Sequence, residues 1–283
     1  MTSSPQSAAF LGPEYSYSHL AALKHYGEQT ELSPVGTIGE VFEAVDRGVA
    51  PSGIVPMDNS TDGRVVDTME RFLKHDLTIQ AEVYLLIEHA FLISGDFDSV
   101  REVQSKPQAL SQCRGWLAQN VPSGRLREVS STAQAATNAA NDPAIAAIAS
   151  KNAGIALGLK VHESGIQDDK TNVTRFVVIG KSDVETAEFP SVEYKTDLIL
   201  EIAHKPGALA DALQVFKNHQ LNMTWIESFP VPGAPTQYIF FMELVGFAHD
   251  PSVDKALSDL EREVQSMRVL GTFPRMNHPL LKP

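Results

Sequence analysis

The chain has 283 residues, 23 of them basic and 35 acidic, and a formal net charge of −12 at pH 7. That length allows a large core and predicts one large domain with one small one. The acidic balance, without any lysine or arginine cluster, argues against nucleic-acid binding. No apolar run approaches the ~20 residues that cross a bilayer. An anionic ligand would therefore have to be bound by local donors: single cations, backbone amides and helix N-termini.

The cellular compartment follows from the N-terminus and from cysteine usage. The N-terminus lacks the basic and apolar regions of a secretory signal. The single cysteine, Cys113, cannot form an intramolecular disulfide and is interpreted as a small buried residue. Both features predict a cytoplasmic protein. The nine histidines show no HxH or HxxxH spacing, so neither a metal nor another cofactor is expected.

The first 180 residues alternate short apolar runs with segments of helical spacing, which predicts an α/β domain with helix-covered sheets. Ligands of such domains bind at strand ends, where helix N-termini converge. In chain order, the pattern predicts a strand at 8–12, a helix ending near 26, a helix at 38–45, a strand at 52–56, a helix at 65–74, a strand pair within 81–94, helices at 107–118 and 132–141, a strand at 144–148 and a helix at 150–158.

A charged stretch at 184–195 is interpreted as a linker between a domain at 7–183 and a smaller domain at 196–275. The smaller domain predicts a βαββαβ order, which is that of a ferredoxin-like sandwich. Its elements are expected at 196–203, 207–219, 222–229, 236–245, 251–265 and 267–273. Residues 282–283 are expected to form a disordered tail.

The run Asn172-Val173-Thr174-Arg175-Phe176 places a hydroxyl beside a cation, directly before an apolar segment. In a strand, Thr174 and Phe176 would share one face and Arg175 would lie on the other. The start of the strand, or a twist, could still let Thr174 and Arg175 reach one pocket. Such a pair suits an anionic substrate that loses a hydroxyl group. The alternative is an edge strand with one snorkelling arginine.

Four other loops are rich in polar residues: 12–18, 56–63, 105–113 and 130–136. Three loop segments place Ser or Thr where a helix begins, so that hydroxyls and free amides can cap the helix or hold an anion. The phosphate-binding glycine motifs and the GxSxG elbow of hydrolases are missing from the sequence.

Taken in order, GPEYSYS, VPMDNS, KPQALSQC, STAQAA and NVTRFVVIG resemble the prephenate dehydratase family over residues 8–181. HKPGALADAL and NMTWIESFPVPG, further along, are similar to an ACT regulatory domain. The resemblance implies an α/β fold, with a two-lobed catalytic domain like that of periplasmic binding proteins and a C-terminal ACT domain. It also implies the conversion of prephenate to phenylpyruvate, with loss of carbon dioxide and hydroxide, in L-phenylalanine biosynthesis, without a metal or cofactor.

The resemblance also implies roles for single residues. Thr174 would assist departure of the hydroxide in a dry site. Arg175 would clamp a carboxylate, or else form a structural ion pair, and Phe176 would pack against the ring or in the wall. The remaining candidates are donors to the substrate's carboxylates and hydroxyl or line its site: Asn59, Ser60, Ser16, Ser105, Gln108, Thr132 and Asn172.

The sequence departs from the family pattern at Asp58, Lys106 and Tyr15, which stand where the family usually has glutamate, histidine and glycine. These changes leave arogenate, an amine analogue of prephenate, as an alternative substrate. A prephenate decarboxylase on the same fold is a second alternative, although the intact Thr-Arg-Phe run argues against it. A third is a non-catalytic amino-acid sensor.

The ACT-like part implies a feedback site for L-phenylalanine and a homodimer or dimer of dimers. Phe229 replaces the arginine of the family's Glu-Ser-Arg-Pro motif, and an ACT module that only dimerises is the alternative. The exposed edge of a βαββαβ sheet needs covering, which also favours pairing. No chorismate mutase segment is expected, because few residues precede the first strand. The expected effector residues come from one turn and from a strand of the partner subunit: Gly207, Ala208, Leu209, Ala210, Asn222, Met223, Thr224, Glu227 and Ser228.

Overall fold

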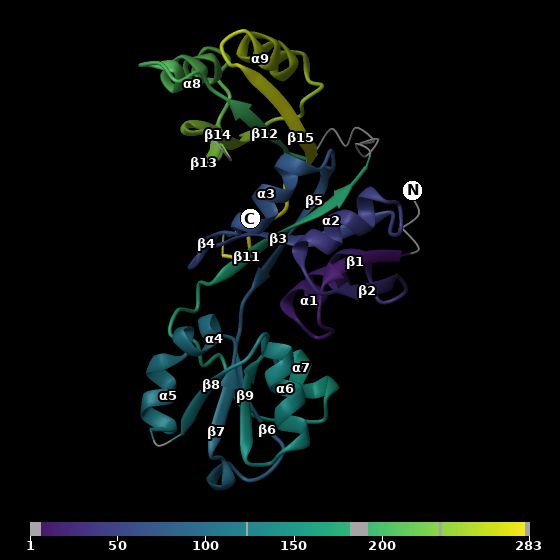
Figure 1. Ribbon diagram of the computed structural model, residues 1–283, viewed down its shortest axis with the longest axis vertical. Helices are drawn as coiled ribbons and strands as arrows, with labels where there is room; N and C mark the ends of the chain where they lie inside the picture. Colours follow the sequence, from purple (N-terminus) through teal and green to yellow (C-terminus); the bar gives the residue numbers. More distant parts are fainter. Residues whose placement is uncertain (1–6, 123, 182–191, 232–233, 281–283) are drawn as a thin grey trace. The chain divides into compact units, whose positions relative to one another are not determined.

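The computed structural model describes residues 7–122, 124–181, 192–231 and 234–280 (Figure 1). The chain divides into two compact units. The first unit consists of Met1–His75, Val83–Val177 and Asn277–Pro283, and the second consists of Asp76–Glu82 and Val178–Met276. Two strands, β5 (Thr78–Leu86) and β11 (Val173–Gly180), therefore contribute residues to both units.

The first sheet has the strand order β2-β1-β3-β11-β5, with β4 paired to β3. Strand β1 is parallel to both β2 and β3, and β4 is antiparallel to β3. The apolar faces of α2 and α3 bring Phe42 and Phe72 together edge to face, with 5.0 Å between ring centroids. The bounds of this part are β1 Ser7–Leu11, α1 Tyr17–Tyr26, β2 Glu31–Val35, α2 Ile38–Asp46, β3 Ser52–Asn59, β4 Gly63–Arg64 and α3 Val66–Lys74.

The second sheet has the order β10-β6-β9-β7-β8, in which β7 is parallel to β8 and β9 while β6 is antiparallel to β9 and β10. Alternation along β6 sends Phe91 and Ile93 into one core cluster, with α4 and α5, and Leu92 into another, with α6 and α7. The bounds are β6 Ala90–Ile93, η1 Phe97–Ser99, β7 Glu102–Ser105, α4 Pro107–Gln112, α5 Arg114–Asn120, β8 Arg125–Glu128, α6 Thr132–Asn141, β9 Ile145–Ala149, α7 Lys151–Ala156 and β10 Lys160–Ser164.

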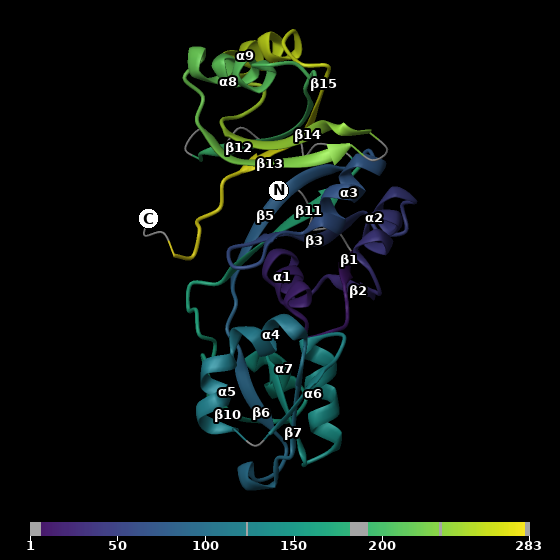
Figure 2. The same cartoon turned by 60° about the vertical axis from the view of Figure 1, so that its left-hand side comes forward.

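The second unit contains a four-stranded sheet of order β13-β14-β12-β15, whose neighbouring strands are all antiparallel. Helices α8 and α9 lie together on one face of this sheet (Figure 2). Their apolar sides share a buried core with alternate residues of β12 and β14, among them Leu198, Leu200 and Met242. The bounds are β12 Tyr194–Glu201, α8 Ala208–Asn218, β13 Met223–Val231, β14 Ala234–Val245, α9 Pro251–Glu261 and β15 Ser266–Pro274.

The predicted fold class is confirmed, with two mixed α/β sheets followed by a βαββαβ unit. Helix α6 occupies the predicted range residue for residue. The single helix predicted at 107–118 is wrong, because Cys113 leaves helical geometry and divides the segment into α4 and α5. Five strands were missed: β2, β4, β7, β8 and β10. Strands β2, β4, β8 and β10 have mostly exposed or half-buried residues and so show no apolar run, whereas β7 is short and contains buried polar residues.

The linker prediction needs a correction at its end. Residues 184–191 lie outside the described residues, as do 282–283, but Tyr194 and Lys195 are the first residues of β12. Lys195 is only 5% exposed. Its charge suggested a solvated position, whereas two buried carboxylates pair with it inside the fold. The division into domains at 7–183 and 196–275 stays a prediction.

Among the described helices, none is both long enough and apolar enough to cross a membrane. In the same part of the chain, histidine, cysteine, aspartate and glutamate side chains do not gather in any group of three or more that could hold a metal ion.

Candidate active site

Asn59, the last residue of β3, organises the start of β11. Its side-chain amide donates to the hydroxyl oxygen of Thr174 (2.8 Å) and to the side-chain oxygen of Asn172 (2.7 Å). Its own oxygen accepts from the backbone N–H groups of Thr61 and Asp62, both at 2.9 Å. Asn59 is therefore fixed at both ends, and it fixes the position of the Thr174 side chain.

The hydroxyl of Thr174 is oriented by this contact. A threonine hydroxyl has one proton and two acceptor lone pairs, and Asn59 uses a lone pair. The proton therefore stays available for another acceptor. Ser60 joins the same two strands, because its backbone N–H donates to the Val173 carbonyl and its hydroxyl accepts from the Val173 N–H (both 2.9 Å). The predicted residues Asn59, Ser60, Asn172 and Thr174 are thus brought together.

Arg175 lies apart from this group. It is 3% exposed, and its Nη1 is 3.8 Å from the Asp58 carboxylate. Asp58 and Asn59 are successive residues of β3, just as Arg175 and Thr174 are successive residues of β11. Since side chains alternate along a strand, the two contacts lie on opposite faces of the sheet. The geometry thus follows the alternation, and it gives Arg175 the ion pair that the sequence left as an alternative.

A pocket of about 490 Å³ opens in the first unit next to these strand ends. Two predicted residues, Gln108 and Asn172, contribute to its wall. Its polar lining offers several neutral donors beside three carboxylates. The lining residues are Thr61, Asp62, Pro107, Gln108, Ser111, Gln112, Asp168, Asp169 and Asn172.

Two of these carboxylates accept hydrogen bonds from backbone N–H groups. Both oxygens of Asp168 accept from the Gly115 N–H, at 3.1 and 3.2 Å, near the start of α5. Asp169 accepts from the hydroxyl of Thr171 (2.6 Å) and from its backbone N–H (2.7 Å). These bonds lower the pKa of Asp169, which therefore stays ionised. Hydrogen bonds to the two anions stabilise the turn that leads into β11.

A chain of polar contacts runs inward from the pocket. Gln112 donates to Asp62 (3.3 Å), and its oxygen lies 2.9 Å from Nε2 of His89. The hydroxyl of Tyr17 lies 2.7 Å from the Glu88 carbonyl oxygen and 3.0 Å from Nδ1 of His89, and these two acceptors share its single proton. Because the Gln112 oxygen can only accept, it places the imidazole proton on Nε2. Burial lowers the pKa of His89 and raises that of the Tyr17 phenol, so both groups are neutral.

Of three further predicted substrate donors, two make structural hydrogen bonds and the third lies at the start of a helix. Ser16 caps α1, where its hydroxyl accepts from the His19 N–H. Ser105 is fully buried, and its hydroxyl donates to the Ile148 carbonyl (2.6 Å). Thr132 is the first residue of α6, whose N-cap is Ser131. Capping, the simpler interpretation of a hydroxyl at a helix start, thus accounts for the hydroxyls of Ser16 and Ser131.

The remaining pocket residues had only weak signals in the sequence. Asp62, Ser111 and Gln112 belong to the two polar loops at 56–63 and 105–113, so their segments were found but not the residues themselves. The pair Asp168-Asp169 would most simply be a solvated turn, yet both residues line the pocket. Tyr15 has a φ of 65°, in the left-handed region that glycine adopts freely, which explains why the family usually has glycine there.

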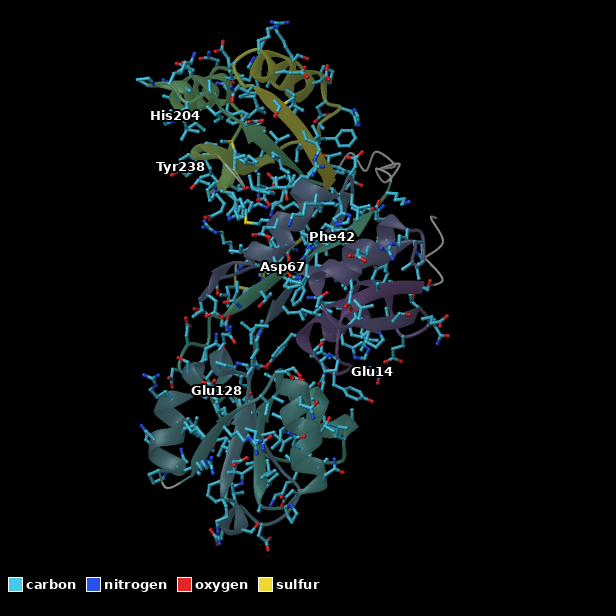
Figure 3. All side chains as sticks on the ribbon, in the orientation of Figure 1. Glu14, Phe42, Asp67, Glu128, His204 and Tyr238 are labelled. Carbon is cyan, nitrogen blue, oxygen red and sulfur yellow. The ribbon has the colours of Figure 1, made fainter. Side chains whose placement is uncertain are left out.

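The second unit has a separate pocket of about 390 Å³. It surrounds the start of α8, where Gly207 has a φ of 83° and the helix has no side-chain cap. His204 and Tyr238, both labelled in Figure 3, belong to its lining. Of the predicted effector residues, Ala208 and Leu209 contribute to this wall, whereas Asn222, Met223, Thr224, Glu227 and Ser228 lie on or just before the edge strand β13. The wall consists of Ile202, Ala203, His204, Lys205, Pro206, Ala208, Leu209, Tyr238 and Phe240.

Comparisons with known proteins agree with this geometry. A curated relative, the bifunctional chorismate mutase/prephenate dehydratase of Aquifex aeolicus, is 38% identical over 268 residues, covering 94% of this chain and 73% of the relative. The solved structure of prephenate dehydratase from Arthrobacter aurescens in complex with L-Phe matches with a TM-score of 0.85 and 26% identity, covering 96% of this chain and 93% of that one.

A second solved structure is the quorum quenching acylase GqqA, with a TM-score of 0.86 and 26% identity over 95% of this chain and 98% of that one. The fold is therefore shared with a protein described by another activity. The family profile described as "Prephenate dehydratase" matches residues 8–184, which include both polar strand ends and the pocket. The chain belongs to the prephenate dehydratase family, the hydro-lyases of phenylalanine biosynthesis.

Proposed function

We propose that Thr174 is the group that assists hydroxide departure when this enzyme converts prephenate to phenylpyruvate. In that reaction the bond to the ring carboxylate breaks and releases carbon dioxide. Its electron pair completes the aromatic ring as the C–O bond breaks, and the departing hydroxide takes up a proton to leave as water. A hydrogen bond from Thr174 stabilises the charge that develops on this oxygen.

The Asn59 contact is the observation that carries this proposal. An alcohol is a poor acid in water, so it helps only as a donor held in the right direction. Asn59 holds the Thr174 oxygen at 2.8 Å without using its proton. Prephenate carries two carboxylates, and Gln108, Gln112 and Asn172 supply neutral amide donors for them in the pocket wall. We assign Arg175 to its ion pair with Asp58 rather than to a carboxylate clamp.

Turnover of prephenate by Thr174→Ala tests the role of Thr174. The phenylpyruvate formed is measured by its ultraviolet absorbance in alkali. We expect kcat to fall by about 10²- to 10⁴-fold while substrate binding stays close to that of the unchanged protein. Thr174→Ser keeps the hydroxyl and should recover much of the loss. The matched control is Thr137→Ala, which removes an exposed threonine hydroxyl from α6. An equal loss of binding and turnover would make Thr174 a structural residue.

The same assay separates the rival activities. Carbon dioxide release accompanies dehydration but not acyl transfer, so it distinguishes a dehydratase from an acylase of the GqqA kind. Prephenate and arogenate, assayed side by side, determine which of the two is preferred. If neither releases carbon dioxide above the uncatalysed background, the proposed function is wrong.

We further propose that the pocket at the start of α8 binds L-phenylalanine as a feedback inhibitor. The uncapped N–H groups of this helix and the Lys205 ammonium suit the carboxylate of an amino acid. Leu209, Tyr238 and Phe240 supply an apolar surface for a phenyl ring. The Arthrobacter aurescens relative, solved in complex with L-Phe, supports this choice of ligand.

We also propose that two chains pair through their C-terminal sheets. Strand β13 stands at one edge of the described sheet, with β14 as its neighbour, so its outer backbone groups can bond to a second copy. Pairing there would bring the predicted effector residues of β13 into the partner's site. Sedimentation equilibrium should therefore give a dimer or a dimer of dimers, and a monomer at micromolar concentration would contradict the pairing.

Titration calorimetry with L-phenylalanine tests the effector site. The unchanged protein should release or absorb heat on binding, and Gly207→Val should abolish the signal. A β-branched residue cannot adopt the φ of 83° found at Gly207 without strain. The control is Gly48→Val, at a φ of 71° far from both pockets in the chain, which should leave the heat unchanged. A flat titration of the unchanged protein would rule out the regulatory site.

A further inference from the structure

A buried charge cluster lies in the second unit. Lys195 of β12 places its ammonium 3.0 Å from a carboxylate oxygen of Glu82 and 3.1 Å from one of Glu243. The three residues are 5%, 1% and 2% exposed. Two carboxylates thus share one cation out of contact with water, where an ion cannot move away from its partners without a large loss of electrostatic energy.

One arm of this cluster extends to the predicted effector strand. The Thr224 hydroxyl of β13 donates to the Glu243 oxygen that also faces Lys195. The register of β13 against β14 shifts between Met223 and Trp225, so Thr224 occupies a bulge. Bulges redirect a side chain and occur next to functional sites. This one directs a residue of the predicted effector strand at a buried carboxylate.

The other arm extends to β5. Glu82 accepts from Lys195 through one oxygen and from the Met276 backbone N–H (2.9 Å) through the other. Gly271 of β15 permits a close backbone approach at the same strand, since an added Cβ would lie 2.0 Å from the Ile79 carbonyl oxygen. Strand β5 is therefore held by the first strand of the C-terminal sheet and by the last strand with the residues that follow it.

Strand β5 in turn lies beside β11, which carries Thr174. The Thr78 hydroxyl donates to the Gly180 carbonyl near one end, and the Ile87 N–H donates to the Asn172 carbonyl at the other (2.8 Å). Asn172 is also one of the two partners of the Asn59 amide. A displacement of β5 along its length would therefore move Asn172 and, through it, the Asn59 amide that orients Thr174.

We propose that the Lys195 cluster couples the effector site to the catalytic strand pair. This coupling rests on the proposed phenylalanine site and has two arms. The regulatory arm is Thr224–Glu243–Lys195, and the catalytic arm is Lys195–Glu82–β5–β11. Phenylalanine bound in the α8 pocket of one chain, against β13 of its partner, changes the Thr224–Glu243 contact on that strand. The buried charges then shift together, and β5 moves with them. Strands β5, β12, β13 and β14 can be followed in Figures 1 and 2.

The test uses two variants that each cut one arm while leaving Lys195 a buried carboxylate partner. Glu82→Gln retains the Glu243–Lys195 pair, and Glu243→Gln retains the Glu82–Lys195 pair, so neither strands an unpaired buried cation. Glu201→Gln is the matched control, because it removes a carboxylate from the same strand as Lys195 but outside the cluster. Thermal melts verify folding, and calorimetry gives the phenylalanine affinity.

We expect both variants to bind phenylalanine and turn over prephenate within about threefold of the unchanged protein. Saturating phenylalanine inhibits an ordinary allosteric enzyme by about 5- to 150-fold. In both variants this inhibition factor should fall toward one. The control should remain fully inhibited.

Two results would overturn the inference: full inhibition in either variant, or loss of inhibition in the control. Loss of phenylalanine affinity in the variants would show that the cluster shapes the site rather than transmits its occupancy, which also contradicts the coupling. If the unchanged protein turns over prephenate but binds no phenylalanine, the regulatory proposal fails and this inference with it, while the dehydratase assignment stands. Absence of prephenate turnover would instead contradict the proposed reaction.

Discussion

At the scale of single residues, the geometry of the site depends on which hydrogen-bond donors and acceptors each side chain uses. Asn59 donates both amide protons to the start of β11 and accepts two backbone N–H groups with its oxygen. All of its side-chain hydrogen-bonding groups thus serve to join the loop at 59–62 to β11. The direction of the Thr174 hydroxyl therefore depends on Asn59 as much as on Thr174 itself.

Asn59→Asp tests this dependence with almost no change in shape. The carboxylate can still accept from Thr61 and Asp62, but it cannot donate to Asn172 or Thr174. Loss of a donor to a neutral partner corresponds to about 1–3 kcal/mol, so kcat should fall about 5- to 150-fold. KM should change much less, and Asn141→Asp in α6 serves as the control. A variant with unchanged kcat would show that Thr174 needs no orienting contact.

The ion pair between Arg175 and Asp58 predicts a stability effect in place of a binding effect. Arg175→Met replaces a buried cation and leaves Asp58 without it, so the free energy of unfolding should fall by about 3 kcal/mol in chemical denaturation. Asp58→Asn in the same chain should recover part of this loss. If Arg175→Met instead raised KM for prephenate while stability held, the clamp role expected from the sequence would be restored.

At the scale of elements, the sequence predicted best where a periodic apolar pattern met an N-cap. Helix α6 is an example, with Ser131 accepting from the Gln134 N–H at its start and an alanine face turned inward. Strand β8 could not be predicted, because all four of its residues are exposed and pairing with β7 alone defines it. Alternation along β11 was also legible, but it left open whether Thr174 and Arg175 reach one pocket.

Residues whose role depends on a distant partner were beyond the sequence. Lys195 was taken for a linker charge because Glu82 and Glu243 lie far from it along the chain. Ser105 was taken for a substrate donor, since nothing in its loop shows that its hydroxyl bonds to Ile148 in β9. Gln112 gained its importance only from the contact with His89. Local patterns therefore predict elements, while long-range polar contacts determine which side chains reach a site.

The tight contact between α6 and β9 makes a prediction at this scale. Ala135, Ala136 and Ala139 are fully buried against Ala147 and Ala149, so small side chains on both elements allow a close approach. Ala136→Leu should overpack this contact and lower the free energy of unfolding by about 1–3 kcal/mol. Gln134→Leu, on the exposed side of the same helix, should have little effect. Equal stability of the two variants by denaturant titration would contradict the tight packing.

At the scale of the whole molecule, the chain crosses between the two sheets of the first unit twice, and the crossings bond to one another. The Ile87 N–H donates to the Asn172 carbonyl, while the Gly165 and Ile166 N–H groups donate to the His89 carbonyl. The His89 N–H donates to the side chain of Gln167 (3.0 Å). His89 is 3% exposed at this crossing and also touches Tyr17 and Gln112, so its charge state affects both sheets.

The pKa of His89 gives a prediction for the pH dependence of stability. Burial lowers this pKa in the folded protein below the ordinary value of about 6.5. As pH falls below about 6.5, the unfolded chain therefore binds a proton that the folded chain does not. The free energy of unfolding must then decrease, by up to about 1.4 kcal/mol per pH unit from this group, until the folded pKa is passed.

Urea titrations between about pH 7.5 and about pH 5, which bracket the ordinary histidine pKa of about 6.5, measure this slope. His89→Asn should reduce this slope. Part of the slope should remain, because burial also lowers the pKa values of His19 and His25. His249→Asn, which removes an exposed histidine, should leave the slope unchanged. The comparison uses the slope and not the absolute stability, so a packing loss at position 89 does not disturb it. An unchanged slope in His89→Asn would mean that the crossing tolerates a charged imidazole, and the neutral Tyr17–His89–Gln112 chain would then be wrong.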